Sequence, residues 1–132
     1  MAKARARHIL VSTEEACNTL KTQIEGGMVQ GISSALFEQL VFQEGVLQNP
    51  NFVDYRIATT VDTPDQMECF IVEVPQDDGP YGARGVGEHP MVPTIAAIAN
   101  AIYDAVGIRL QGPPFTAEKL FLAIKEHAPT GS

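Results

Sequence analysis

Glycine and proline concentrate between Pro75 and Pro93, and this concentration excludes regular secondary structure from the middle of the chain. Glycine adopts φ > 0 easily and lets a ligand approach the backbone closely, whereas proline fixes φ. Loops of this length inside compact domains are commonly functional. Residues 82–90 (GARGVGEHP) set one carboxylate, Glu88, among three glycines and close at Pro90. The sequence therefore predicts a shaped loop that presents a carboxylate.

Glu88 has two interpretations at this point. It is either a reactive glutamate held on that loop, or one acid in a glycine-rich connection that only joins a strand to a helix. The positive charge of Arg84 would lower its pKa, whereas desolvation beside Val86 would raise it, and the sequence leaves open which effect is larger. His89 either pairs with Glu88 or faces solvent. We favour solvent for His89, because adjacent loop residues commonly point apart.

Two helices are predicted before the loop. Ser12 or Thr13 can cap a helix that runs to about residue 24, with acids in its first turn. The Gly26-Gly27 pair is expected to end or kink this helix. Apolar residues then recur at helical spacing over residues 28–40, which predicts a second amphipathic helix.

Besides a short strand at residues 8–11, extended structure is predicted in two places. Apolar residues flank Glu44-Gly45 within residues 41–47, as in a tight hairpin. Residues 66–74 carry apolar side chains on both faces, with Met67, Cys69 and Ile71 on one and Phe70, Val72 and Val74 on the other. This second pattern is typical of a central strand.

Two further helices are predicted after the loop. Pro93-Thr94 opens the first, and Gly107 stands where its C-cap is expected. Thr116 is a candidate N-cap for the last helix, and residues 127–132 are expected to form a frayed tail. The whole pattern predicts an α+β fold of about four helices packed on a small mixed sheet.

Composition narrows the class of protein. A chain of 132 residues with 45% hydrophobic content suits one domain. Its formal net charge of -7 disfavours nucleic acid and anionic membrane surfaces as partners.

Cys17 and Cys69 belong to no zinc or iron-sulfur motif, so we expect reduced, buried thiols. The apolar stretch after the basic N-terminus is too short for a signal peptide, and no run reaches membrane-spanning length, which predicts a cytoplasmic protein.

Three ordered segments carry a family resemblance: residues 23–31 (QIEGGMVQG), 49–55 (NPNFVDY) and 79–88 (GPYGARGVGE). Together they resemble the C-terminal part of the molybdenum-binding subunit of xanthine dehydrogenase, aldehyde oxidase and related molybdenum hydroxylases. The similarity continues through residues 98–105 and 114–119, so it covers about residues 22–126. The ordered set is much more specific than any one motif.

The resemblance implies a site and a cofactor. Glu88 matches the glutamate that acts as general base in the hydroxylation of an aldehyde or an N-heterocycle. Gln23 matches the glutamine that hydrogen-bonds the pterin of molybdopterin, and Gly87 would bring its backbone close to the metal centre. No residue of this chain is implied as a metal ligand. Iron-sulfur and FAD centres would lie on other domains or subunits.

The start of the chain resembles a different family. Residues 1–27, with HILV at 8–11 followed by a helix, are similar to the opening strand and helix of parvulin-type peptidyl-prolyl isomerases, and His8 matches their active-site histidine. The two resemblances overlap at residues 23–27. This predicts a natural or engineered fusion: a segment of different origin at 1–27, a molybdenum hydroxylase-like domain at 22–126 and a flexible tail at 127–132.

Three functions remain open from the sequence. The favoured one is a component or fragment of a molybdenum hydroxylase that works with other segments or subunits of that enzyme. Alone, the chain is expected to be inactive and to bind cofactor weakly or not at all. The alternative is an inactive fusion or fragment that acts as an interaction or scaffold domain, pairing with another chain or with a second copy. Prolyl isomerase activity is the least favoured, because the later parvulin strands are lacking.

Overall fold

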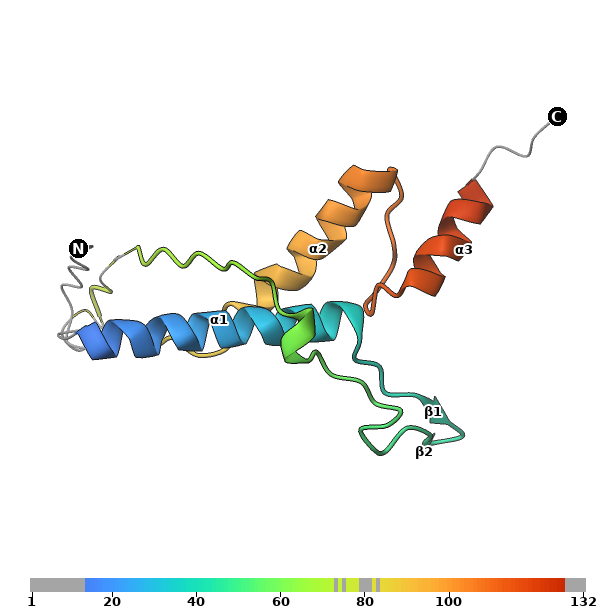
Figure 1. The fold of residues 1–132 in the computed structure, drawn as a ribbon, viewed down its shortest axis with the longest axis horizontal. Helices are drawn as coiled ribbons and strands as arrows, with labels where there is room; N and C mark the ends of the chain where they lie inside the picture. Colours follow the sequence, from blue (N-terminus) through green and yellow to red (C-terminus); the bar gives the residue numbers. More distant parts are fainter. Residues whose placement is uncertain (1–13, 73, 75, 79–81, 83, 128–132) are drawn as a thin grey trace.

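The computed structural model describes residues 14–72, 74, 76–78, 82 and 84–127 (Figure 1). Helix α2 lies across the long helix α1, and the hairpin follows the C-terminal end of α1 (Figure 1). The elements, in chain order, are α1 (Glu14–Leu36), β1 (Phe42–Gln43), β2 (Val46–Leu47), the 3-10 helix η1 (Thr60–Asp62), α2 (Met91–Val106) and α3 (Ala117–His127).

Helix α1 is continuous from Glu14 to Leu36, so the predicted break at Gly26-Gly27 is wrong. The described residues therefore form three α-helices rather than the predicted four. A glycine inside a helix costs about 1 kcal/mol relative to alanine, which is the basis of the prediction of a break. Tertiary packing outweighs this local preference, because α2 crosses α1 at these positions.

Two glycines on one face of α1 allow the crossing to be close. A Cβ atom at Gly27 would lie 3.2 Å from the ring of Pro90. A Cβ atom at Gly31 would lie 2.6 Å from Cβ of Thr94 and 2.8 Å from the carbonyl oxygen of Met91. Side chains at i and i+4 share a helix face, so the two glycines form one groove that receives the first turn of α2. A side chain at Gly31 would require α2 to move, whereas a Cβ at Gly27 would require Pro90 to shift by a few tenths of an ångström.

The buried residues gather around the C-terminal half of α1. Ala35 is fully buried, and its carbonyl oxygen accepts a hydrogen bond of 2.6 Å from the backbone N–H of Phe115, which is also buried. Buried Ser33 accepts a bond of 2.9 Å at its Oγ from the backbone N–H of Ala58. These contacts fasten the segments before η1 and before α3 to the same end of α1.

A buried asparagine organises the base of the hairpin. Oδ1 of Asn49 accepts a hydrogen bond of 2.9 Å from the backbone N–H of Val41, and its Nδ2 donates one of 2.6 Å to the carbonyl oxygen of Gln39. Both bonds satisfy polar groups that burial would otherwise penalise. Asn49 therefore closes the loop that holds the hairpin.

The sheet is smaller than predicted. Strands β1 and β2 pair antiparallel, with Phe42 opposite Leu47, and Glu44 and Gly45 turn the chain at φ 50 and 80°, which confirms the hairpin. Residues 66–72 and 74 belong to no strand. The described residues thus form a two-stranded antiparallel sheet rather than a mixed one, because residues 66–72 have no described strand beside them. The predicted strand at 8–11 lies outside the described residues.

Both predicted helices after the loop are confirmed. Helix α2 begins at Met91, slightly before the predicted start, with Pro90 at its N-cap. Gly107 ends it in the left-handed conformation at φ 71°, and its N–H donates to the carbonyl oxygen of Tyr103 at 2.7 Å. Oγ1 of Thr116 accepts a bond of 3.2 Å from the N–H of Lys119, as an N-cap of α3 does.

Helix α3 runs through His127, so that residue is helical rather than part of a tail, and residues 128–132 lie outside the described part. Among the helices described here, none combines the length and the apolar character needed to cross a membrane.

Substitution of Gly31 tests the helix crossing. We expect Gly31→Ala to lower the free energy of unfolding by about 1–3 kcal/mol, because the added methyl group overlaps Thr94 and the Met91 carbonyl. Gly26 is the matched control, since a Cβ there meets nothing within 4 Å. Gly26→Ala should raise stability by up to about 1 kcal/mol. Urea unfolding followed by circular dichroism measures both, and equal effects would refute the close crossing.

The Tyr55–Glu38 contact predicts a dependence on alkaline pH. The Tyr55 hydroxyl donates to Oε2 of Glu38 at 2.6 Å, and this bond, with burial and the carboxylate charge, raises the pKa of Tyr55. The pKa of Tyr55 is higher in the folded chain than in the unfolded chain. The contact therefore contributes its full stabilisation of the fold at pH values below the unfolded pKa, and this stabilisation is lost as the pH rises through the folded pKa.

The measurement is a spectrophotometric titration of tyrosine in the folded chain. Subtracting the titration curve of the Tyr55→Phe variant isolates the signal of Tyr55. The pKa of this residue should lie above that of an ordinary tyrosine. Glu38→Gln should bring its pKa down toward the ordinary value, since the charge that opposes the phenolate is gone. An unchanged titration in Glu38→Gln would contradict the assignment.

Candidate functional site

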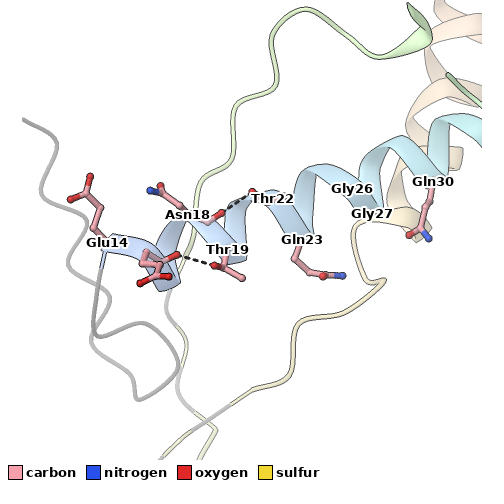
Figure 2. Close-up of a pocket in the computed structure, with 9 residues that line it drawn as sticks. Glu14, Asn18, Thr19, Thr22, Gln23, Gly26, Gly27 and Gln30 are labelled. Atoms are coloured by element: carbon pink, nitrogen blue, oxygen red, sulfur yellow. Dashed lines mark hydrogen bonds between the residues drawn. The ribbon is translucent and has the colours of Figure 1, made fainter. Parts of the chain in front are cut away.

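Gln23 lies in an open groove along the N-terminal half of α1 (Figure 2). The groove has a volume of about 990 Å³ and is lined mostly by polar side chains and glycine: Glu14, Glu15, Asn18, Thr19, Thr22, Gln23, Gly26, Gly27 and Gln30. Its side chains can bind polar groups, while its accessible surface is divided about evenly between polar and apolar atoms.

The hydroxyl groups in the groove are already engaged with the helix backbone. Oγ1 of Thr19 donates to the carbonyl oxygen of Glu15 at 2.9 Å, and Oγ1 of Thr22 donates to that of Asn18 at 3.0 Å (Figure 2). Gln23 is exposed and makes no hydrogen bond to another described residue. Its amide can donate two hydrogen bonds and accept others, so it is the side chain best placed to bind a ligand.

The glycines of the groove divide into two kinds. Gly27 is buried under Pro90, so the fold itself requires it. Gly26 is exposed, and a Cβ there would meet nothing within 4 Å. A mid-helix glycine that no neighbour requires leaves the helix surface free for something outside the chain to approach. The same open space surrounds Gly85 and Gly87 in the loop.

The loop places Glu88 just before α2. The carbonyl oxygen of Glu88 accepts a hydrogen bond of 3.0 Å from the N–H of Met91, which fixes the backbone of the residue against the helix start. The side chains of Glu88 and Arg84 are both exposed.

The loop glycines only partly take the conformation that we expected of them. Gly82 lies at φ 75° and needs to be glycine, whereas Gly85 and Gly87 do not have positive φ. His89 is exposed, as we favoured, and its Nδ1 accepts a bond of 3.3 Å from the N–H of Gly87. His89 therefore supports the turn around Glu88 through the backbone.

The helix crossing brings the two halves of the predicted site to one side of α1. Gln23 and Gly27 are one turn apart on the same face, and Gly27 touches Pro90, which is two residues from Glu88. The segment that leads into α2 passes α1 on the side to which Gln23 points (Figure 2). Gly27 of the groove and Pro90 of the loop are thus in contact although they lie far apart in the sequence, whereas none of residues 84–90 lines the groove itself.

The cysteines and other metal-binding side chains form no second site. Cys17 is buried and Cys69 is half-buried, and neither is in a disulfide. Within the described ranges, no group of three or more His, Cys, Asp or Glu side chains could hold a metal ion. The region around Gln23 and Glu88 remains the candidate site.

Sequence reasoning missed Gln30. It lies seven residues after Gln23, on the same face of α1 and in the same groove (Figure 2). Helical spacing through Gln23, Gly27 and Gln30 was the available signal. The prediction of a break at Gly26-Gly27 assigned Gln30 to a separate helix and hid this face.

The sequence of the chain is similar to the sequences of one group of proteins. Residues 17–64 match the family described as molybdopterin cofactor-binding domain. The putative xanthine dehydrogenase molybdenum-binding subunit of Escherichia coli is 40% identical over 101 residues, which is 75% of this chain and 13% of that protein. The aldehyde oxidoreductase of Megalodesulfovibrio gigas is 40% identical over 111 residues, or 83% of this chain and 12% of that protein.

Solved structures agree with the sequence comparisons. Quinoline 2-oxidoreductase from Pseudomonas putida matches 84% of this chain with a TM-score of 0.76 and 30% identity. A Cu,Mo-containing CO dehydrogenase matches 81% with a TM-score of 0.73 and 28% identity. The chain covers 14% of each of those chains. It therefore corresponds to a small part of each protein that it resembles.

A bulky residue at Gly27 should separate the loop from α1. We expect Gly27→Leu to displace Pro90 and to speed amide hydrogen exchange in residues 84–90, because the side chain takes the space of the proline ring. Gly26→Leu is the control, since its side chain would enter open space. Exchange measured by mass spectrometry should change only in the first variant. The same loop exchange in both variants would show that Gly27 does not hold the loop.

Proposed function

We propose a function for this chain from one premise: it is homologous to a segment of the molybdenum-binding subunits of the xanthine dehydrogenase and aldehyde oxidoreductase family. The proposed function is to complete the cofactor pocket of a molybdenum hydroxylase, with Glu88 as general base and Gln23 as a ligand of the cofactor. The proposal rests on the Gly27–Pro90 contact, because Gly27 lines the groove of Gln23 and Pro90 lies two residues after Glu88.

The residues present fit the polar part of molybdopterin. Gln23 offers an exposed amide without a described hydrogen-bond partner, and Gln30 offers a second amide on the same helix face. Gly26 and Gly87 leave open space where any larger residue would carry a Cβ. A pterin is a flat ring system with donors and acceptors on its edge, which such amides can bind. When bound, the cofactor supplies the two-electron oxidation that side chains cannot perform.

Glu88 supplies the proton chemistry in this proposal. Its carboxylate would take up the proton that is released when an oxygen nucleophile attacks an electron-poor carbon of an aldehyde or an N-heterocycle. General bases act best when their pKa lies near the working pH, which for a glutamate requires partial desolvation. His89 holds the adjacent Gly87 N–H and so keeps the loop in shape, acting as a positioning residue.

Completion of the pocket requires other polypeptide segments. Glu88 is exposed here, so the surroundings that would close a pocket over it must come from other segments. We infer that the partners are the remaining segments of a large subunit and the polypeptides that carry iron-sulfur and FAD centres. Because the chain spans only 12–14% of the relatives that it matches, substrate choice would depend mainly on those partners. The separate chain would be inactive.

A second candidate function is a non-catalytic interaction domain. Large apolar side chains are exposed on several elements, among them Phe42 on the hairpin, Phe70 in the extended segment and Phe121 on α3. Such surfaces mark sites of association. An oligomer of this chain that is stable without molybdenum or pterin would favour this function. Prolyl isomerase activity stays the least favoured prediction, because the later parvulin strands are lacking; His8 lies outside the described residues.

The proposed origin of the chain from two parts is independent of its function. We keep the division into residues 1–27, 22–126 and 127–132 as a proposal, with the last boundary moved after His127. Helix α1 passes through residues 22–27 without interruption, so any junction there joins two helical sequences in register.

Replacement of Glu88 tests the general base. In the enzyme assembled with its partners, Glu88→Gln should lower kcat/KM by about 10²–10⁴-fold, because the amide keeps the shape but cannot accept the proton. Molybdenum and pterin content should stay unchanged. Glu118→Gln, an exposed change in the first turn of α3, is the control and should leave activity intact. Full activity of the Glu88→Gln enzyme would exclude Glu88 as the base.

A further inference from the structure

Residues 66–72 form an extended segment that runs beside α1 without strand pairing (Figure 1). Within the described part of the chain, none of their backbone N–H and C=O groups hydrogen-bonds to another backbone group. Extended backbone in this state presents a row of donors and acceptors, which is the template that a β-strand recognises.

The segment has an inner and an outer face. Met67 and Cys69 are half-buried, and burial, followed by the negative charge of Glu25 on α1, raises the pKa of the Cys69 thiol. These two residues therefore face α1, whereas Ile71, the next residue at that spacing, is 38% exposed. On the outer face, Phe70 and Val72 are each 81% exposed. Alternation of this kind is expected of a strand that packs against the protein on one face and has an unpacked apolar face on the other.

We propose that residues 66–72 accept a β-strand from another polypeptide by main-chain hydrogen bonding. The partner strand would carry apolar residues at alternate positions, to pair with Phe70 and Val72, and a basic residue opposite Glu68. This deepens the proposed function in one respect, since the natural donor would be another segment of the same large subunit. The recognition itself depends only on backbone pairing and on these side chains.

Two other occupants are less suited to this surface. The predicted strand of the chain's own N-terminus, residues 8–11, is shorter than the segment that it would have to cover. A second copy of the chain would bring together two molecules of formal charge -7, with Asp65 and Glu68 at the pairing segment of each. Apolar surface is also exposed far from this segment, on α3 and the hairpin, which indicates a partner larger than either.

The test uses the full chain and a designed peptide in which valine and threonine alternate between two terminal lysines. Peptide in excess should slow amide hydrogen exchange in residues 66–72 by at least about tenfold. The control peptide has the same side chains but is N-methylated at every valine and threonine, so it cannot donate backbone hydrogen bonds. It should give no protection. Equal protection by both peptides, or none by either, would overturn the proposal.

Charge reversal tests the recognition of Glu68. Glu68→Lys should weaken protection by the lysine-flanked peptide several-fold and strengthen protection by a glutamate-flanked one, whereas Glu118→Lys on α3 should do neither. If residues 66–72 of the free chain are already protected and lose protection when residues 1–12 are deleted, the occupant is the N-terminus and the proposal fails. Protection that rises with chain concentration alone would identify a second copy instead.

Neither experiment involves the cofactor or Glu88, so a negative result in either would not contradict the general-base proposal. Evidence against Glu88 as the general base would likewise not contradict strand addition.

Discussion

The close crossing of α1 and α2 at Gly27 and Gly31 is the contact on which the rest of the structure depends. With no side chain at these positions, the first turn of α2 comes down onto α1, and Pro90 and Thr94 occupy the space. The loop of residues 84–87 is short and leads directly into that turn. Its position relative to the Gln23 groove is therefore a consequence of helix packing rather than of the loop sequence.

Little else holds the elements together, which explains why so much apolar surface is exposed. Few residues are buried among those described: the hydrophobic ones are Cys17, Ala35, Pro114 and Phe115, and Gly27 and Gly31 are buried at the helix crossing. Helix α3 is tied to α1 through the Phe115–Ala35 backbone bond and the burial of Phe115 beside it. A small core gives little stabilisation against the conformational entropy of the chain. The exposed faces of the hairpin, the extended segment and α3 are thus expected to gain most of their stability from contacts with partner polypeptides.

The sequence predicted best where local chemistry decides the structure. Gly107 ends α2 and Thr116 caps α3, as predicted. Both predictions were correct because each feature depends only on a backbone conformation or a hydrogen bond within one helical turn. The hairpin is similarly local. Prediction failed at Gly26-Gly27 and at residues 66–74, where the outcome depends on what lies across from the segment. A partner helix keeps α1 intact, whereas the absence of a described neighbouring strand leaves residues 66–72 unpaired.

The site shows the same division between local and distant causes. The motif around Glu88 was visible in the sequence, and so was the glutamine at 23, but their common location on α1 follows from the Gly27–Pro90 contact alone. Gly26 and Gly87 differ from Gly27 in having no neighbour that requires them to be small. A glycine in mid-helix costs stability, and its presence at an open position therefore calls for a reason outside the chain. A ligand that lies against both Gly26 and Gly87 would supply that reason, and in the proposed function it would also cover the exposed side chain of Glu88.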